Sequence, residues 1–165
     1  MSESDPVVTN SGPLIALASV GQLNILNVLY TTVLVPEAVW REVTEAGTGR
    51  PGARELTVTS WVSRVTLDPP PDRLLTEELG AGEAEAITLA VQHRARLLLM
   101  DDRRARRVAE LAYGLRVKGV AGIVAAAKRR GLITEIRPLL EMMRTHGYYL
   151  SSRLIERACH EAGEA

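Results

Sequence analysis

The stretch GEAEAITLAVQHRARLLLMDDRRARR, residues 82–107, predicts the centre of the fold. Glu83 and Glu85 open an amphipathic helix whose apolar positions recur at near-helical spacing as far as His93. A short, wholly apolar run follows at residues 97–100, which is typical of a strand buried on both faces of a parallel sheet. The pattern therefore predicts a helix followed by a central strand.

Two carboxylates, Asp101 and Asp102, come directly after this predicted strand. In open parallel α/β sheets, ligands bind at the carboxyl ends of the strands, so the pair is a candidate site. Asp102 has an alternative role as the N-cap of the next helix, in RRARRVAELAYG. Capping explains one aspartate and leaves the other without a role, which favours a functional role for at least one of them.

A basic cluster follows the aspartates and predicts a surface that binds phosphate groups. Arg103, Arg104, Arg106 and Arg107 offer local positive charge beside the acids, although they could instead form an ordinary solvated helix face. Other basic residues stand before the strand and later in the chain, namely Arg94, Arg96, Lys128, Arg129 and Arg130. Any nucleic acid would depend on such patches, because Lys+Arg and Asp+Glu both number 20.

The composition predicts one domain over residues 1–165. The chain is 46% hydrophobic, which is enough to bury one core. The single cysteine, Cys159, excludes an internal disulfide framework and is interpreted as incidental. No apolar run reaches the length of a membrane span, and the N-terminus does not have the pattern of a secretory signal, so we expect a soluble cytoplasmic protein.

Strand and helix patterns alternate along the chain. This rhythm predicts a three-layer α/β domain with a central, mostly parallel sheet flanked by helices. The predicted strands are residues 6–9, 33–35, 61–67, 97–100 and 116–118. The predicted helices follow Pro13, Leu23, Pro36, Glu83 and Asp102, and later cover residues 120–128, 136–145 and 150–162.

Two polar residues elsewhere are predicted to reach the same sheet edge as the aspartates. Asn10 follows the first strand and is either a turn residue or a functional side chain at the strand end. Glu42 is offset from the solvated row of Glu37, Arg41 and Glu45 and adjoins the apolar side of its helix. A glutamate in that position is costly unless it has a partner or a metal ion.

Right-handed crossovers would gather these oxygen-bearing side chains into an acidic pocket. Several carboxylates at short range need a counter-charge, and Mg²⁺ or Mn²⁺ with oxygen ligands is the usual solution. Such an ion polarises a phosphodiester and lowers the pKa of bound water, so hydrolysis of a nucleic-acid backbone is the reaction that suits the pocket best. Nucleophilic catalysis has no support, because no Ser or Cys has an evident His partner.

Five segments together resemble the PIN-domain superfamily, and more narrowly its VapC-like group DUF3368. They are VVTNSGPLIALASVGQLNIL, VPEAVWREV, GAGEAEAITLA, LLLMDDRRARRVA and VKGVAGIVAAAKRRGLI. The resemblance covers residues 7–135 and leaves 136–165 as a C-terminal helical extension. It implies a Rossmann-like sheet and a Mg²⁺- or Mn²⁺-dependent single-strand ribonuclease, usually the toxin of a toxin–antitoxin pair. It also implies RNA and a small antitoxin protein as partners, and commonly a homodimer.

The resemblance also implies a site. The acidic quartet of the family falls on Asn10, Glu42, Glu83 and either Asp101 or Asp102, with the metal held by Asn10, Glu83 and the aspartates. The superfamily has aspartate where this chain has Asn10; an amide oxygen can ligate Mg²⁺, but the lost charge weakens the attraction for the cation. Glu85 is a candidate to compensate for that loss.

Three alternatives stay open. The chain could be a catalytically silent PIN-fold module that binds RNA or an antitoxin-like partner, or a small-molecule phosphatase on a similar sheet. The apolar N-terminal helices, residues 14–18 and 23–29, could form a dimer surface or simply core.

Overall fold

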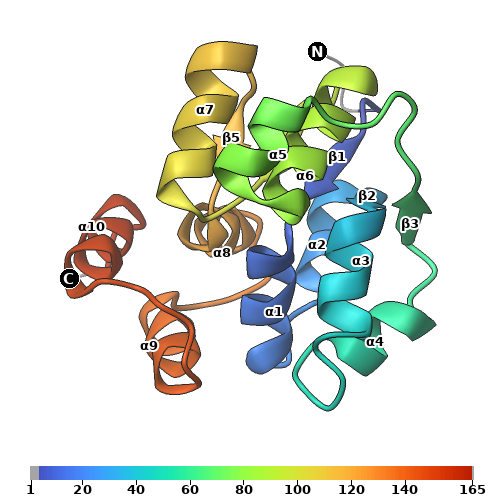
Figure 1. Cartoon of the computed structure of the whole chain (residues 1–165). Helices are drawn as coiled ribbons and strands as arrows, with labels where there is room; N and C mark the ends of the chain where they lie inside the picture. Colours follow the sequence, from blue (N-terminus) through green and yellow to red (C-terminus); the bar gives the residue numbers. More distant parts are fainter. Residues whose placement is uncertain (1–3, 165) are drawn as a thin grey trace.

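A five-stranded parallel sheet forms the middle layer of the computed structural model, which describes residues 4–164 (Figure 1). The strand order is β3-β2-β1-β4-β5, and every neighbouring pair is parallel. The strands are β1 (Val7–Thr9), β2 (Val33–Pro36), β3 (Val62–Val65), β4 (Leu97–Leu99) and β5 (Val117–Lys118). The predicted three-layer α/β fold is confirmed.

The central strands are apolar apart from Thr9 at the end of β1, because both faces of the sheet are covered. Successive residues point to opposite faces, so Val7 and Leu99 join one hydrophobic core while Val8 and Leu98 join the other. All four side chains are at most 1% exposed. The continuous apolar runs of the sequence therefore reflect two cores that share one sheet.

The helices divide between these two faces. The larger core takes α1 (Ser11–Ser19), α2 (Ile25–Tyr30), α3 (Glu37–Thr44), α4 (Ala53–Val58) and α8 (Val120–Arg129). The smaller core takes α5 (Arg73–Leu79), α6 (Ala81–Gln92) and α7 (Arg103–Tyr113). Leu14, Leu17 and Leu26 are completely buried, so these side chains of α1 and α2 belong to the core. Among residues 4–164, no helix is long and apolar enough to cross a bilayer.

The chain reverses its direction across the sheet beside β1. It runs outward from β1 to β2 and β3, and then returns through α5 and α6 to β4 on the other side of β1. Thr9 pairs with Leu99, and the next backbone N–H, that of Asn10, donates to the Leu99 carbonyl over 2.9 Å. Residues 10 and 101 are therefore brought to the topological switch point, where open α/β sheets bind their ligands.

Two short helices, α4 and α5, were not predicted, because glycine and proline surround them. Gly52 precedes α4 in a left-handed conformation, and its N–H donates to Glu55 Oε2 over 2.8 Å. Asp72 caps α5 by accepting from the Leu74 N–H over 2.8 Å. Local capping begins both helices inside segments whose composition otherwise indicates loops.

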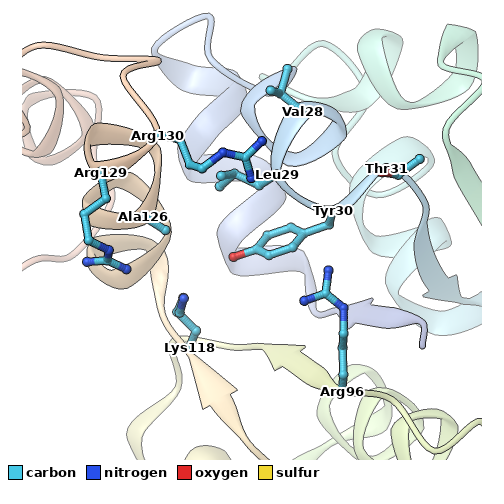
Figure 2. A pocket seen from close by; sticks show the side chains of 9 residues that line it. All are labelled: Val28, Leu29, Tyr30, Thr31, Arg96, Lys118, Ala126, Arg129 and Arg130. Carbon is cyan, nitrogen blue, oxygen red and sulfur yellow. The ribbon is translucent and has the colours of Figure 1, made fainter. Parts of the chain in front are cut away.

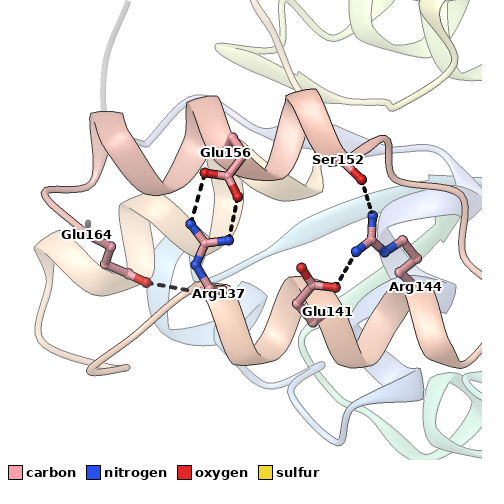
Figure 3. Close-up of polar contacts among 6 residues, drawn as sticks. All are labelled: Arg137, Glu141, Arg144, Ser152, Glu156 and Glu164. Carbon is pink, nitrogen blue, oxygen red and sulfur yellow. Dashed lines mark hydrogen bonds and ion pairs between the residues drawn. The ribbon is translucent and has the colours of Figure 1, made fainter.

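The C-terminal helices α9 (Arg137–Thr145) and α10 (Ser152–Glu161) belong to the larger core. Ile136, Leu140, Met143 and Ile155 are at most 1% exposed, and Cys159 is fully buried among them. An ion pair between Arg137 and Glu156 and a hydrogen bond from Arg144 to Ser152 join the two helices, and Arg144 also pairs with Glu141 within α9 (Figure 3). In the structure, the predicted extension thus packs as part of the core.

Glu164 fastens the end of the described chain to the start of α9. Its carboxylate accepts from the backbone N–H group of Arg137 over 3.1 Å (Figure 3). It also accepts from the Ile136 N–H over 2.7 Å and pairs with Lys128 Nζ at 2.9 Å. We expect Glu164→Gln to lower the free energy of unfolding by about 1–2 kcal/mol, because hydrogen bonds to a charged group are lost or weakened. Denaturant unfolding at neutral pH measures the change.

A matched substitution, Glu161→Gln, removes the same charge from an exposed position whose ion pair with Arg157 spans 3.8 Å, and it should be nearly neutral. Burial tends to raise the pKa of Glu164, but the hydrogen bonds from Ile136, Lys128 and Arg137 outweigh it and lower the pKa below 4.5. The stabilisation is therefore complete above the unfolded pKa and is lost as the pH falls through the lower, folded pKa. Equal losses of unfolding free energy in the two variants would contradict a stabilising role for the Glu164 contacts.

Candidate functional site

Asn10 occupies the carboxyl end of β1 and carries the most distinctive polar atom of the site. It is the N-cap residue of α1, yet its side chain makes no capping hydrogen bond. The residue is 4% exposed, and within residues 4–164 its buried Oδ1 has no hydrogen-bond partner. Leaving a buried acceptor unpaired costs about 1–3 kcal/mol, so this oxygen is suited to an external ligand.

Glu42 meets Asn10 across Gly82. A side-chain carbon added at Gly82 would lie 3.0 Å from Glu42 Oε2 and 3.5 Å from Asn10 Oδ1, so both oxygens point to the same small space. The prediction that Glu42 turns toward the sheet edge is therefore confirmed. Desolvation raises the pKa of the Glu42 carboxyl, the charge of Glu83 raises it further, and a hydrogen bond with the Ser11 side chain partly offsets both.

Glu83 and Glu85 lie on the first turns of α6, but their side chains contact different residues. Glu83 is close enough to Glu42 to repel it, and its Oε2 lies 3.4 Å from the place of a carbon added at Gly80. Glu85 Oε1 instead accepts from the Ala38 N–H over 3.3 Å, in the first turn of α3. Glu85 therefore ties α6 to α3 by accepting from a backbone N–H in the first turn of α3.

Asp101 follows β4 and is held by two hydrogen bonds. Its Oδ1 accepts from the Val120 N–H over 3.0 Å, and its Oδ2 accepts from the Tyr148 hydroxyl over 2.5 Å. Its Cβ is 3.9 Å from the place of a carbon added at Gly12, in the first turn of α1. Burial raises the pKa of Asp101, while Tyr148, the Val120 N–H and Arg106 act against the rise.

Tyr148 was missed by sequence reasoning. It follows α9, and only the packing of that helix against α1 brings its hydroxyl to the end of β4. Burial and the neighbouring Asp101 charge raise the pKa of the Tyr148 phenol, so it stays a hydrogen-bond donor. No motif or spacing in the sequence signals this contact.

Asp102 is separated from Asp101 by its environment. It is exposed and caps α7, where its Oδ1 accepts from the Ala105 N–H over 2.8 Å. The capping alternative is thus confirmed for Asp102, while Asp101 is the aspartate at the switch point.

The arginines of α7 line the surface beside these aspartates. Arg103, Arg104 and Arg107 are all exposed. Arg104 is partly engaged, because its Nη2 lies 3.1 Å from Glu78 Oε1, and both residues share a shallow cavity with Arg107. Within residues 4–164, Arg103 and Arg107 have no ion pair, so they keep their charge available to a phosphate group.

The oxygen donors are consistent with a magnesium-type ion. Over residues 4–164, no three His, Cys, Asp or Glu side chains gather closely enough to hold a metal on their own. The unpartnered amide oxygen of Asn10 supplies a third donor beside Glu42 and Glu83. Because Mg²⁺ takes oxygen ligands and usually keeps several waters, few protein oxygens suffice.

Comparison with known families agrees with this geometry. The profile of DUF3368, described as a PIN domain, matches residues 6–164. No curated protein matches the chain. The matched region includes the whole sheet, both cores and the helices α9 and α10. PIN domains have a fold of nuclease type, and this chain belongs to the DUF3368 family of PIN domains.

Proposed function

We propose that the chain is a Mg²⁺- or Mn²⁺-dependent endoribonuclease that cleaves single-stranded RNA and acts in the cytoplasm as the toxin of a toxin–antitoxin pair. The observation that supports it most is the buried, unpartnered Asn10 Oδ1, which points with Glu42 into one space at the switch point of the sheet. An unpaired acceptor facing a carboxylate is unfavourable in the free protein and favourable once a cation lies between them.

Asn10, Glu42 and Glu83 would hold the ion, with Asp101 contributing from the end of β4. Each carboxylate oxygen of Asp101 already accepts one hydrogen bond and keeps a second lone pair. When bound, the ion polarises the phosphodiester and lowers the pKa of its water. Arg103, Arg104 and Arg107 would hold flanking phosphates of the RNA on α7.

Incubation of the purified chain with a mixture of single-stranded RNAs tests the proposal. We expect cleavage with Mn²⁺ and none with a chelator, and loss of cleavage in the Glu83→Ala/Asp101→Ala double variant. Identical cleavage by the wild type and the double variant would refute the assignment, because a contaminating nuclease would explain it.

A catalytically silent module that binds RNA or a partner protein is the second candidate. It is favoured by the absence, over residues 4–164, of three clustered carboxylates and by the amide at position 10. Manganese titration separates the two: an enzyme site should bind the ion at millimolar or lower concentration and lose it in Glu83→Ala. A silent module should show no saturable binding.

The Asn10→Asp substitution should strengthen metal binding. It adds a charged oxygen beside Glu42 and Glu83, and we expect the affinity for Mn²⁺ to rise by about tenfold, or about 1.4 kcal/mol. The same charge should lower the melting temperature without metal, because three carboxylates then repel one another. Calorimetry and thermal unfolding with and without Mn²⁺ measure both effects.

Asn24→Asp is the matched control, because Asn24 is exposed before α2 and is not one of the proposed ligands. It should leave Mn²⁺ affinity unchanged. A failure of Asn10→Asp to gain affinity would count against Asn10 as a ligand.

The remaining partners are also proposals. We propose a small antitoxin protein and a homodimer, and light scattering of the purified chain measures the second directly. A monomer at micromolar concentration would remove the homodimer from the proposal.

A further inference from the structure

A basic cavity lies at the amino ends of the strands, at the sheet edge opposite the candidate active site. Its volume is about 450 Å³. Tyr30 at the end of α2, Arg96 just before β4, and Arg129 and Arg130 at the end of α8 surround it (Figure 2). Lys118 reaches it from β5.

The alkyl chain of Lys118 passes beside Gly122 of α8 on its way to the cavity. A side-chain carbon added at Gly122 would lie 2.6 Å from Lys118 Cγ and 3.3 Å from its Cδ. Glycine at position 122 therefore makes room for the alkyl chain, and the ammonium group extends into the cavity (Figure 2). The lysine is held by its packing and not simply spread on the surface.

The four cations have no counter-charge of their own. No acidic residue lines the cavity, and within residues 4–164 none of Arg96, Lys118, Arg129 and Arg130 forms an ion pair. Arg96 is fixed over the Tyr30 ring, with its guanidinium carbon 5.6 Å from the ring centroid, and its Nε donates to the Asp5 carbonyl over 3.2 Å. Like charges are thus held together in a concave site, where their field is focused.

Tyr30 and Lys118 both line the cavity, and an anion there would interact with each of them. Desolvation and the charges of Arg129, Arg116 and Arg96 lower the pKa of Lys118. Over residues 4–164 the buried Tyr30 hydroxyl has no hydrogen-bond partner, and it is turned toward Lys118 and Arg129 (Figure 2). Burial raises the pKa of Tyr30 to about 12, although Arg96 and Arg129 oppose the rise, so the hydroxyl remains a donor.

We propose that this cavity is a second binding site, for an anion that carries at least two phosphate groups. Four cations match the charge of two or more phosphates, and arginine binds phosphate oxygens in bidentate fashion. Tyr30 donates its hydroxyl to one phosphate oxygen. The volume suits a small ligand. The phosphates can come from a free compound such as a nucleoside diphosphate or triphosphate, or from an RNA backbone.

Calorimetry on the whole chain, in a chelator that prevents cleavage, tests the site with pyrophosphate, with ATP and with an oligoribonucleotide of about 10 nucleotides. We expect one pyrophosphate per chain and a loss of affinity of at least about tenfold in Arg129→Gln/Arg130→Gln. The control Arg54→Gln/Arg153→Gln removes the same charge from exposed positions and should change the affinity by less than about twofold. No binding of any of the three probes, or equal losses in both double variants, overturns the proposal.

Tyr30→Phe gives a second test that does not depend on the stability of the arginine variants. The hydroxyl has no partner to lose, so the melting temperature should be unchanged or higher, while pyrophosphate affinity falls several-fold. Unchanged affinity would contradict the assigned contact. Displacement of pyrophosphate by the oligoribonucleotide identifies RNA as the source, and independent pyrophosphate binding identifies a free compound. These readouts are binding and not cleavage, so they stand or fall separately from the proposed nuclease.

Discussion

The Asp101→Asn variant is expected to fold like the wild type and to lose RNA cleavage by about a hundredfold or more. The substitution conserves shape and removes one charge. The amide oxygen can still accept from the Val120 N–H, and the Tyr148 hydroxyl can reverse and accept from the new NH₂ group. The lost charge is the part that a cation and a developing phosphate charge would sense, so cleavage falls while stability changes little.

Asp102→Asn is the matched comparison for this prediction. Asparagine caps helices about as well as aspartate, so α7 should start unchanged at the Ala105 N–H. Initial rates of RNA cleavage with Mn²⁺, beside thermal unfolding of each variant, measure the difference. Equal losses of cleavage in the two variants would contradict the assignment of Asp101 to the site and of Asp102 to the helix cap.

The Gly119→Ala substitution should displace the side chain of Asp101, although it leaves residue 101 itself unchanged. A side-chain carbon at position 119 would lie 2.5 Å from Asp101 Oδ1 and 2.9 Å from Arg106 Nη1. Arg106 can turn away, but the carboxylate is fixed by two donors, so it or the start of α8 must move. We expect a loss of about 1–3 kcal/mol in unfolding free energy, and a loss of cleavage close to that of Asp101→Asn.

A double-mutant cycle isolates the cause. In an Asp101→Ala background the obstructing oxygen is absent, so Gly119→Ala should cost much less than it does in the wild type. Denaturant unfolding of the four proteins gives the coupling energy. Additive effects would mean that the alanine strains the backbone of α8 and not the carboxylate.

Local patterns of the sequence were sufficient to predict the central strand and the direction of one site residue. Apolar residues 97–100 indicated a strand buried on both faces, and β4 is such a strand, paired with β1 and β5. The helical offset of Glu42 correctly placed it toward Asn10, because a helix periodicity fixes which side a residue takes.

Contacts that depend on distant parts of the chain could not be predicted. Which aspartate caps α7 was decided by the direction of the chain after β4, and Tyr148 reaches Asp101 only through the packing of α9. Glu85 looked equivalent to Glu83 in sequence, yet the tertiary approach of α3 gave it a backbone partner. The basic cavity likewise combines residues from α2, β5 and α8 that share no local pattern.

The hydroxyl that donates to Asp101 belongs to Tyr148, in the connection between the last two helices, α9 and α10, and far along the chain from β4. A protein shortened before residue 148 would leave that carboxylate with a single protein donor and open a gap beside Gly12. The C-terminal segment from residue 148 therefore helps to fix Asp101 in place. Its removal should change binding at the proposed metal site even if the sheet still folds.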